Sequence, residues 1–105
     1  MTRISDRNIL KKIKQGDTGA FEKLYDKYHL NVYNYIRSFV RDSYEAENVL
    51  QDVFISLWET RYKINEYMPI GSLLYRVARN KSLNVLRKEV NKKIYIEYLS
   101  VFYLR

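Results

Sequence analysis

The stretch Glu45-Ala-Glu-Asn-Val-Leu-Gln-Asp-Val-Phe-Ile-Ser-Leu-Trp58 decides the fold, because its apolar residues recur at steps of three and four. This spacing places them along one side of an α-helix and predicts a buried stripe. The stripe consists of Ala46, Val49, Leu50, Val53, Phe54, Leu57 and Trp58. Asp42 lies just before the stretch and, with Glu45 three residues later, is suited to form a capping box. We therefore expect a helix that begins after Asp42 and ends near Thr60.

A second stretch, Leu74-Tyr-Arg-Val-Ala-Arg-Asn-Lys-Ser-Leu-Asn-Val-Leu-Arg87, has the same helical spacing and the opposite charge. Residues 42–59 hold five carboxylates and no lysine or arginine, whereas residues 76–93 hold seven basic residues and one acid. Each helix therefore carries a field of one sign, which suits a chain that lies between a basic surface and a polyanion. The charge pattern favours an adaptor between a protein and a nucleic acid.

The rest of the sequence predicts an all-α domain, a compact bundle of about four helices. Three glycines and one proline leave few positions that break a helix. Ser5 can cap a first helix that ends at Gly16, and Asp17 or Thr18 can cap a second that runs to about Val40. The first helix is expected to bury Ile9, Leu10 and Ile13.

The segment Arg61–Ser72 loses the helical spacing and contains the proline, so we expect a loop there, with Ser72 capping a fourth helix to about Val90. The tail, Ile94–Leu104, has two interpretations. It is a fifth helix, or an extension of the fourth, that completes the core; or it leads into a linker or second domain. A stripe in this tail consists of Tyr95, Tyr98, Leu99, Phe102 and Tyr103.

The composition excludes several classes of protein. At 105 residues the chain forms one domain that can fold without a disulfide or a bound metal. It contains no cysteine, which excludes disulfides and thiolate zinc sites and fits a reducing compartment. We find neither an apolar run of about 20 residues nor a signal peptide, so we expect a cytoplasmic protein without membrane insertion. The net charge of +7 favours a polyanionic partner.

Catalysis finds little support in the sequence. His29 is the single histidine, and its position beside an apolar helical stripe indicates a half-buried or surface residue rather than a general base. The sequence contains no glycine-rich phosphate loop, metal-ligand spacing or nucleophile elbow. We expect a protein that is not an enzyme and that binds no metal or cofactor.

One face of the fourth helix suits nucleic acid. Arginine binds phosphates or guanine edges, and asparagine pairs with adenine edges. The residues that share this face, within about a third of the helix circumference, are Arg76, Asn80, Leu83, Asn84 and Arg87. The preceding loop interleaves aromatic and polar side chains, which suits an unstacked base. These are Tyr62, Lys63, Asn65 and Tyr67. Two plainer readings stay open: the face is an ordinary solvated basic surface, and the tyrosines cap the core.

The same residues resemble the conserved second region of bacterial sigma factors of the extracytoplasmic-function group, over roughly Asp17 to Lys88. Asp17-Thr-Gly-Ala-Phe-Glu-Lys-Leu-Tyr-Asp-Lys-Tyr28 is similar to the family's opening helix. Ala46-Glu-Asn-Val-Leu-Gln-Asp-Val-Phe-Ile-Ser-Leu-Trp58 is similar to its polymerase-docking helix, and Tyr75-Arg-Val-Ala-Arg-Asn-Lys-Ser-Leu-Asn-Val-Leu-Arg87 to its promoter-reading helix.

The resemblance implies that the third helix docks on the coiled coil of the β′ subunit of core RNA polymerase. The matching positions are Asn48, Gln51, Asp52, Phe54 and Trp58. Phe54 and Trp58 could instead belong entirely to the core, which their place in the apolar stripe favours. It also implies that the fourth helix and its loop melt the promoter minus-ten element and capture a flipped base of the non-template strand. The DNA-binding set is Tyr62, Lys63, Asn65, Tyr67, Arg76, Arg79, Asn80, Asn84 and Arg87. An anti-sigma factor is a further partner.

The chain departs from the family at Leu73, Lys81 and Asn84, so its DNA preference cannot be copied from relatives. We interpret residues 1–93 as the second-region domain and residues 94–105 as the start of a linker or an extra helix, with the carboxyl-terminal promoter-binding domain absent. Two alternatives remain: a basic helical protein that binds nucleic acid without polymerase, and a helical protein-interaction module.

Overall fold

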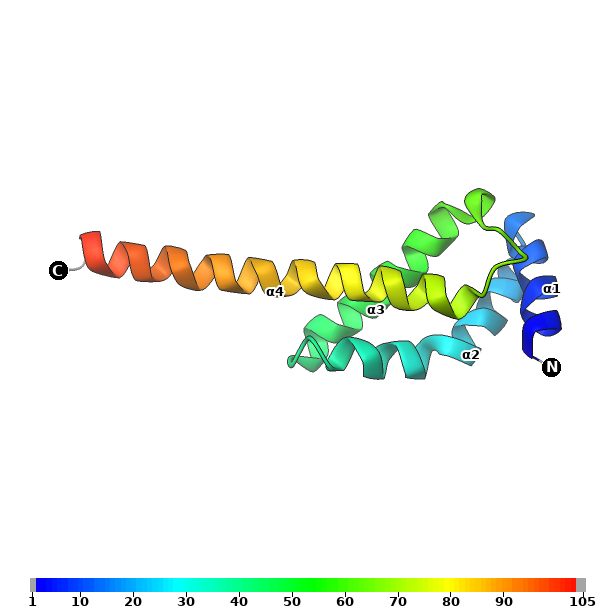
Figure 1. Cartoon of the computed structure of the whole chain (residues 1–105), viewed down its shortest axis with the longest axis horizontal. Coiled ribbons are helices and arrows are strands. Elements are labelled where there is room, and N and C mark those ends of the chain that lie inside the picture. The colour runs from blue at the N-terminus through cyan, green and yellow to red at the C-terminus, as the bar shows by residue number, and fades with distance from the viewer. Residues whose placement is uncertain (1, 104–105) are drawn as a thin grey trace.

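Four α-helices and one short 3-10 helix make up the computed structural model, which describes the backbone of residues 2–103 and the side chains of residues 6–102 (Figure 1). The part described contains no strand, so the predicted all-α class is confirmed. Helices α1, α2 and α3 and the first half of α4 form a bundle, from which the second half of α4 projects (Figure 1). The bounds are α1 Thr2–Lys14, α2 Thr18–Arg37, α3 Ser43–Glu59, η1 Arg61–Lys63 and α4 Ile70–Tyr103.

A glycine ends α1 where the sequence predicts it. Gly16 has a φ of 89°, a left-handed conformation that glycine adopts without steric cost. Its amide donates to the Ile13 carbonyl at 2.8 Å, and the Asp17 amide donates to the Lys12 carbonyl at 3.0 Å. These two bonds form a Schellman motif. The prediction that Ser5 caps α1 is wrong, because the helix begins at Thr2 and no glycine or proline interrupts it there; the Ser5 side chain lies outside the described residues.

Aspartates cap the next two helices. One oxygen of Asp17 accepts from the Ala20 amide at 3.1 Å, and one oxygen of Asp42 accepts from the Tyr44 and Glu45 amides at 2.8 and 3.1 Å. Asp17, one of the two predicted candidates, therefore caps α2, and the predicted cap at Asp42 is confirmed. The other half of the predicted capping box, a bond from the Glu45 side chain back to the Asp42 amide, is not among the hydrogen bonds of the described residues. Helix α2 ends at Arg37, three residues before the predicted limit, because the chain turns at that point. Val40 lies after the turn and is nevertheless buried in the core.

The core fills the space where the four helices meet. The stripe predicted for α3 is buried except for its last member, Trp58, which is half-buried. Helix α3 packs on α2 and α4, and α1 packs on α2. Buried residues from the other elements are Leu10, Ile13, Ala20, Leu24, Val32, Ile36, Val40, Ile64, Ile70, Leu74 and Ala78.

One buried polar side chain disagrees with the apolar pattern. Ser82 of α4 is 0% exposed, and its hydroxyl has no hydrogen-bond partner among the described residues. A buried hydroxyl without a partner destabilises the folded state. We expect Ser82→Ala to raise the free energy of unfolding by about 1 kcal/mol, measured by urea denaturation.

Ser100→Ala is the control for this substitution, because Ser100 is exposed on the same helix and reports the difference in helix propensity alone. A Ser82→Ala protein less stable than its parent would show that the hydroxyl makes a stabilising bond.

Helix α4 differs from its prediction at both ends. It begins at Ile70, directly after the proline, so Ser72 lies inside the first turn and is not the cap. The predicted loop also contains η1. At the other end, α4 continues well beyond Val90 as a single helix, which confirms the extension of the fourth helix.

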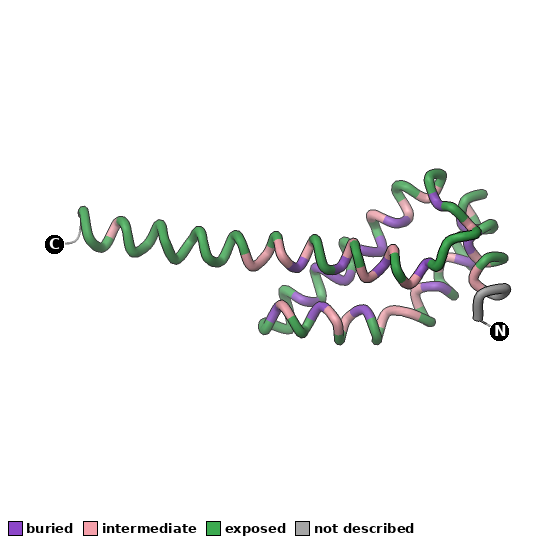
Figure 2. Tube along the Cα trace, viewed as in Figure 1, coloured by how far each residue is buried: buried purple, intermediate pink, exposed green. Residues whose placement is uncertain are grey.

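The extension does not complete the core, so that part of the prediction is wrong. Residues 87–98 are all exposed, as the long green stretch of the projecting helix shows (Figure 2). The radius of gyration is 17.7 Å, against about 13 Å for a compact domain of this length. The Tyr103 side chain of the predicted tail stripe, and Leu104 at the end of the predicted tail, lie outside the described residues. Despite the length of α4, no helix within residues 2–103 could cross a membrane.

Candidate functional site

The side of α3 that faces away from the core carries the polar residues predicted to contact polymerase. Asn48, Gln51 and Asp52 are all exposed, and α3 contains no basic residue. Among the described side chains the one ion pair joins Lys27 and Asp6, so no carboxylate of α3 is neutralised by a neighbour. The surface therefore presents uncompensated negative charge.

Two apolar residues that the sequence analysis missed extend this surface. Tyr44 is 76% exposed and Ile55 is 52% exposed. Together with Asn48 they follow one another at steps of four and seven residues, so they lie on one side of α3. The sequence could have identified both residues as exposed, because they lie outside the predicted buried stripe of the helix.

Phe54 belongs to the core and not to the exposed face of α3. It is 3% exposed, and its ring contacts Tyr25 edge-on at a centroid distance of 4.9 Å. Trp58 is half-buried: its ring packs edge-on against Phe21 at 5.2 Å, and the Arg61 guanidinium lies 4.3 Å from its centroid. Of these two candidates, only Trp58 retains surface that a partner could contact.

Because Trp58 is half-buried, truncating it should destabilise the domain less than truncating a core aromatic residue. We expect Trp58→Ala to lower the free energy of unfolding by about 2 kcal/mol. Truncating a fully buried indole would lower it by about 3–5 kcal/mol. Urea denaturation followed by far-ultraviolet circular dichroism measures the loss. Trp58→Phe, which keeps the contact with Phe21, should lose about half as much. A loss for Trp58→Ala as large as that of a core aromatic would show that the indole is effectively buried.

Tyr62 of η1 and Tyr67 of the loop between η1 and α4 are both exposed, which contradicts the plainer prediction that they cap the core. Tyr62 is 67% exposed and Tyr67 is 69% exposed. Buried Ile64 and Ile70 anchor the loop at either end. Between them, Asn65 accepts a hydrogen bond from the Tyr67 amide at 3.0 Å, an Asx turn that fixes the local backbone.

This loop and the start of α4 enclose a cavity of about 500 Å³. The cavity brings together three residues of the predicted DNA-binding set, Lys63, Asn65 and Arg76. Sequence analysis missed the rest of the lining, because it depends on how the loop folds back on the helix. These residues are Ile64, Met68, Pro69, Ile70, Ser72 and Leu73.

Beyond the cavity, the predicted basic face continues along α4. Arg76, Arg79, Asn80, Asn84 and Arg87 are all exposed, and a nitrogen of Arg87 donates to the Asn84 side-chain oxygen at 3.2 Å. From the first to the last of these residues the face extends about 16 Å along the helix. It can follow several phosphates of a nucleic-acid strand.

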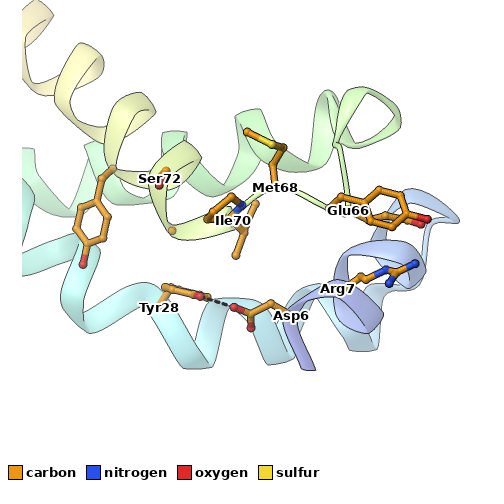
Figure 3. A pocket seen from close by; sticks show the side chains of 11 residues that line it. Asp6, Arg7, Tyr28, Glu66, Met68, Ile70 and Ser72 are labelled. Carbon is orange, nitrogen blue, oxygen red and sulfur yellow. Dashed lines mark hydrogen bonds between the residues drawn. The ribbon is translucent and has the colours of Figure 1, made fainter. Parts of the chain in front are cut away.

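Tyr67 lines a different and larger cavity, of about 880 Å³. Figure 3 shows this cavity from close by. The Arg7 guanidinium of α1 lies 4.1 Å from the Tyr67 ring centroid. Tyr28 of α2 donates to an Asp6 oxygen at 2.7 Å, the bond drawn dashed in Figure 3. Burial and the Asp6 carboxylate raise the pKa of Tyr28 well above its usual range, so the phenol stays protonated. Sequence analysis missed the role of α1 here.

The His29 side chain packs against Tyr25 of its own helix. Its ring stacks on Tyr25 at a centroid distance of 4.7 Å, and Nδ1 donates to the Tyr25 carbonyl at 2.9 Å. Within the described side chains, no group of three or more metal-ligating residues lies together.

Comparison with known proteins gives consistent matches. A family model described as sigma-70 region 2 matches residues 24–91. The RNA polymerase sigma-H factor of Pseudomonas aeruginosa is 30% identical over 86 residues, covering 82% of this chain and 45% of that protein. The ECF RNA polymerase sigma factor SigW of Bacillus subtilis is 28% identical over 80 residues, covering 76% and 43%. The chain spans about half the length of the curated relatives it matches.

Solved structures share the fold. An engineered region 2 of sigmaE, in complex with GTAAAA, matches with a TM-score of 0.76 and 24% identity, covering 83% of this chain and 90% of that one. CnrH, in complex with the cytosolic domain of CnrY, matches with a TM-score of 0.72 and 22% identity, covering 83% and 60%.

Proposed function

The chain belongs to the sigma-70 region 2 family, in its extracytoplasmic-function group, and we propose that it joins core RNA polymerase to promoter DNA at the start of transcription. In this proposal α3 docks on the β′ coiled coil, while α4 and its loop recognise and melt the minus-ten element. The observation that carries it is the separation of charge: an exposed acidic face on α3 and an exposed basic face on α4. The protein would act in the bacterial cytoplasm.

The polymerase contact is supported by residues that the fold leaves free. Gln51 and Asp52 offer hydrogen-bond acceptors, and no basic residue of α3 opposes a basic partner. Exposed Tyr44 and Ile55 add apolar area to the same surface. We assign the contact to these residues and Asn48, with Trp58 at its edge.

The DNA contact is supported by the arrangement of the loop cavity and the basic face. A base can enter a pocket only after it leaves the stack, and an already melted strand lowers that cost. Lys63, Asn65 and Arg76 surround a cavity that an extruded base could occupy. The arginines farther along α4 would hold the phosphates. A protein with the same fold has been solved in complex with GTAAAA.

We extend the proposal to an anti-sigma partner. CnrH, which shares the fold, has been solved in complex with the cytosolic domain of CnrY.

The test compares single-stranded and duplex DNA. The domain should bind single-stranded DNA of the non-template minus-ten element more tightly than the same sequence as duplex, measured by fluorescence anisotropy. It should also retain the β′ subunit from bacterial lysate. DNA binding without β′ retention would favour a polymerase-independent nucleic-acid-binding protein. Retention of β′ together with equal affinity for single-stranded and duplex DNA would support the polymerase contact and contradict the capture of an extruded base.

A further inference from the structure

The second half of α4 presents an apolar face to solvent. With 3.6 residues per turn, six of its residues lie within about 140° of the helix circumference. Each of them exposes between 48% and 64% of its surface. Glu89, Lys93 and Ser100 lie on the opposite side of the helix. We call the six apolar residues the tail face: Val90, Ile94, Tyr95, Tyr98, Val101 and Phe102.

The tail face lies where the bundle does not support the helix, as Figure 2 shows. Seven of the ten residues from 94 to 103 are β-branched or aromatic, and such side chains lose rotamer freedom in a helix. Helices in proteins owe most of their stability to the packing of an apolar face rather than to intrinsic propensity. A contiguous exposed apolar patch of this kind marks an interaction site. The tail face therefore suits a partner surface that is itself apolar.

The tail face is large enough to hold two copies of the chain together. Its exposed surface amounts to about 600 Å² in one copy, to which the three aromatic side chains contribute most. A specific interface between proteins buries at least about 1,000 Å² in total, and two tail faces that cover each other would bury about 1,200 Å². Interfaces at this end of the size range are reversible, so we expect a dissociation constant of about 10 µM.

Charge decides how two copies can lie. Residues 87–93 carry four basic side chains and one acidic side chain, whereas residues 94–103 carry only Glu97. A parallel pair would place the two basic segments side by side, and like charges in an interface oppose association. An antiparallel pair places each basic segment against the part of the second copy that holds Glu97. The charge pattern therefore favours the antiparallel arrangement.

We propose that the tail face binds the tail face of a second copy, as an antiparallel pair of helices around a two-fold axis. In such an interface the same surface patch serves both copies. A pair centred at position 96 sets Val90 opposite Phe102 of the second copy, and Ile94 opposite Tyr98 of the second copy. Each of these layers combines an aliphatic side chain with a ring, which fills the space between two helices.

This pairing leaves the surfaces of the proposed function open. Residues 76–84 of α4 lie outside the paired segments, and α3 belongs to the bundle and not to the extension. The inference therefore goes beyond the proposed function and does not depend on it.

Sedimentation equilibrium of the whole chain, after nuclease treatment, tests the proposal between about 1 and about 200 µM. The mass should rise from the 12.8 kDa of one chain to twice that value. The helical circular dichroism per residue should rise over the same range, because pairing stabilises the extension. Ile94→Glu should raise the dissociation constant at least about 100-fold, because it places a carboxylate in the interface twice. Ile94 is exposed in the single chain, so the urea midpoint of the bundle should not change.

The matched control is Ile96→Glu. It makes the same chemical change at an exposed position about 160° around the helix from Ile94. It should change the dissociation constant less than about threefold, because the side chain points away from the second copy. Equal dissociation constants for the two variants would overturn the proposal, as would a parent chain that stays monomeric at about 200 µM. Association that about 0.5 M salt abolishes would be due to the charged groups, and the apolar interface would then be wrong.

A spin label tests the orientation of the pair. The chain contains no cysteine, so Arg79→Cys provides a single labelling site. Arg79 lies about 25 Å along the helix from position 96, so two labels should be about 50 Å apart in the antiparallel pair and less than about 25 Å apart in a parallel one. Double electron–electron resonance measures this distance. The shorter distance would overturn the antiparallel arrangement.

Discussion

A chain that carries Gln51→Ala and Asp52→Lys together is expected to bind the β′ coiled coil about 30-fold more weakly than its parent, or worse. Removing one partner of a desolvated charge pair costs roughly 2–5 kcal/mol, and the lysine adds repulsion from a basic partner. Both side chains are exposed in the middle of α3, so the helical circular dichroism should not change. Biolayer interferometry with a purified β′ coiled-coil fragment measures the affinity.

The matched control is Asp26→Lys, which makes the same charge reversal at an exposed position of α2. It should weaken binding no more than twofold, because long-range repulsion between solvent-exposed charges is screened at physiological ionic strength. Equal binding by the double variant and its parent would contradict the proposal that α3 contacts the β′ coiled coil.

The geometry of the bundle would allow both proposed partners to bind at once. Helices α3 and α4 pack against each other and against α2 through their apolar stripes. The face of each helix opposite its stripe must then point to solvent. The acidic face and the basic face therefore look outward from different helices and do not neutralise each other.

Local features of the fold could be predicted from the sequence because their causes are local. The α3 stripe follows from helical periodicity, and the caps at Asp17 and Asp42 follow from side chains that bond amides two or three residues away. The left-handed end of α1 follows from Gly16. The start of α4 could not be predicted, because Ser72 and the residue after Pro69 both fit a helix N-terminus.

Features that depend on tertiary contacts could not be predicted. Helical spacing placed Phe54 and Trp58 in one stripe, but only packing against α2 separates a buried ring from a half-buried one. Likewise, the stacking of Arg7 on Tyr67 joins residues sixty positions apart. The residue types of the basic face were visible in the sequence, whereas both cavities arise from the path of the loop.

The second large expected effect concerns the basic face of α4. The double variant Arg76→Ala with Arg87→Ala should weaken binding of every single-stranded sequence about equally, by about tenfold or more at low salt. Both guanidiniums are exposed at either end of the face, where they would neutralise phosphates and release counterions. Each phosphate contact on a single strand contributes roughly −0.7 to the slope of log K against log salt, so the slope should flatten by up to about 1.4. Anisotropy across a salt series measures both quantities.

Two comparisons separate phosphate contacts from base contacts on this helix. Lys92→Ala removes a charge about 140° around the helix from Arg87 and should change the slope little. Asn80→Ala removes no charge, so it should keep the slope and change which base is preferred, because an amide contacts base edges. If the arginine variant instead lost affinity for some sequences and not others, the arginines would contact bases. An unchanged slope would mean that the strand does not follow α4, because phosphate neutralisation is the part of the affinity that salt weakens.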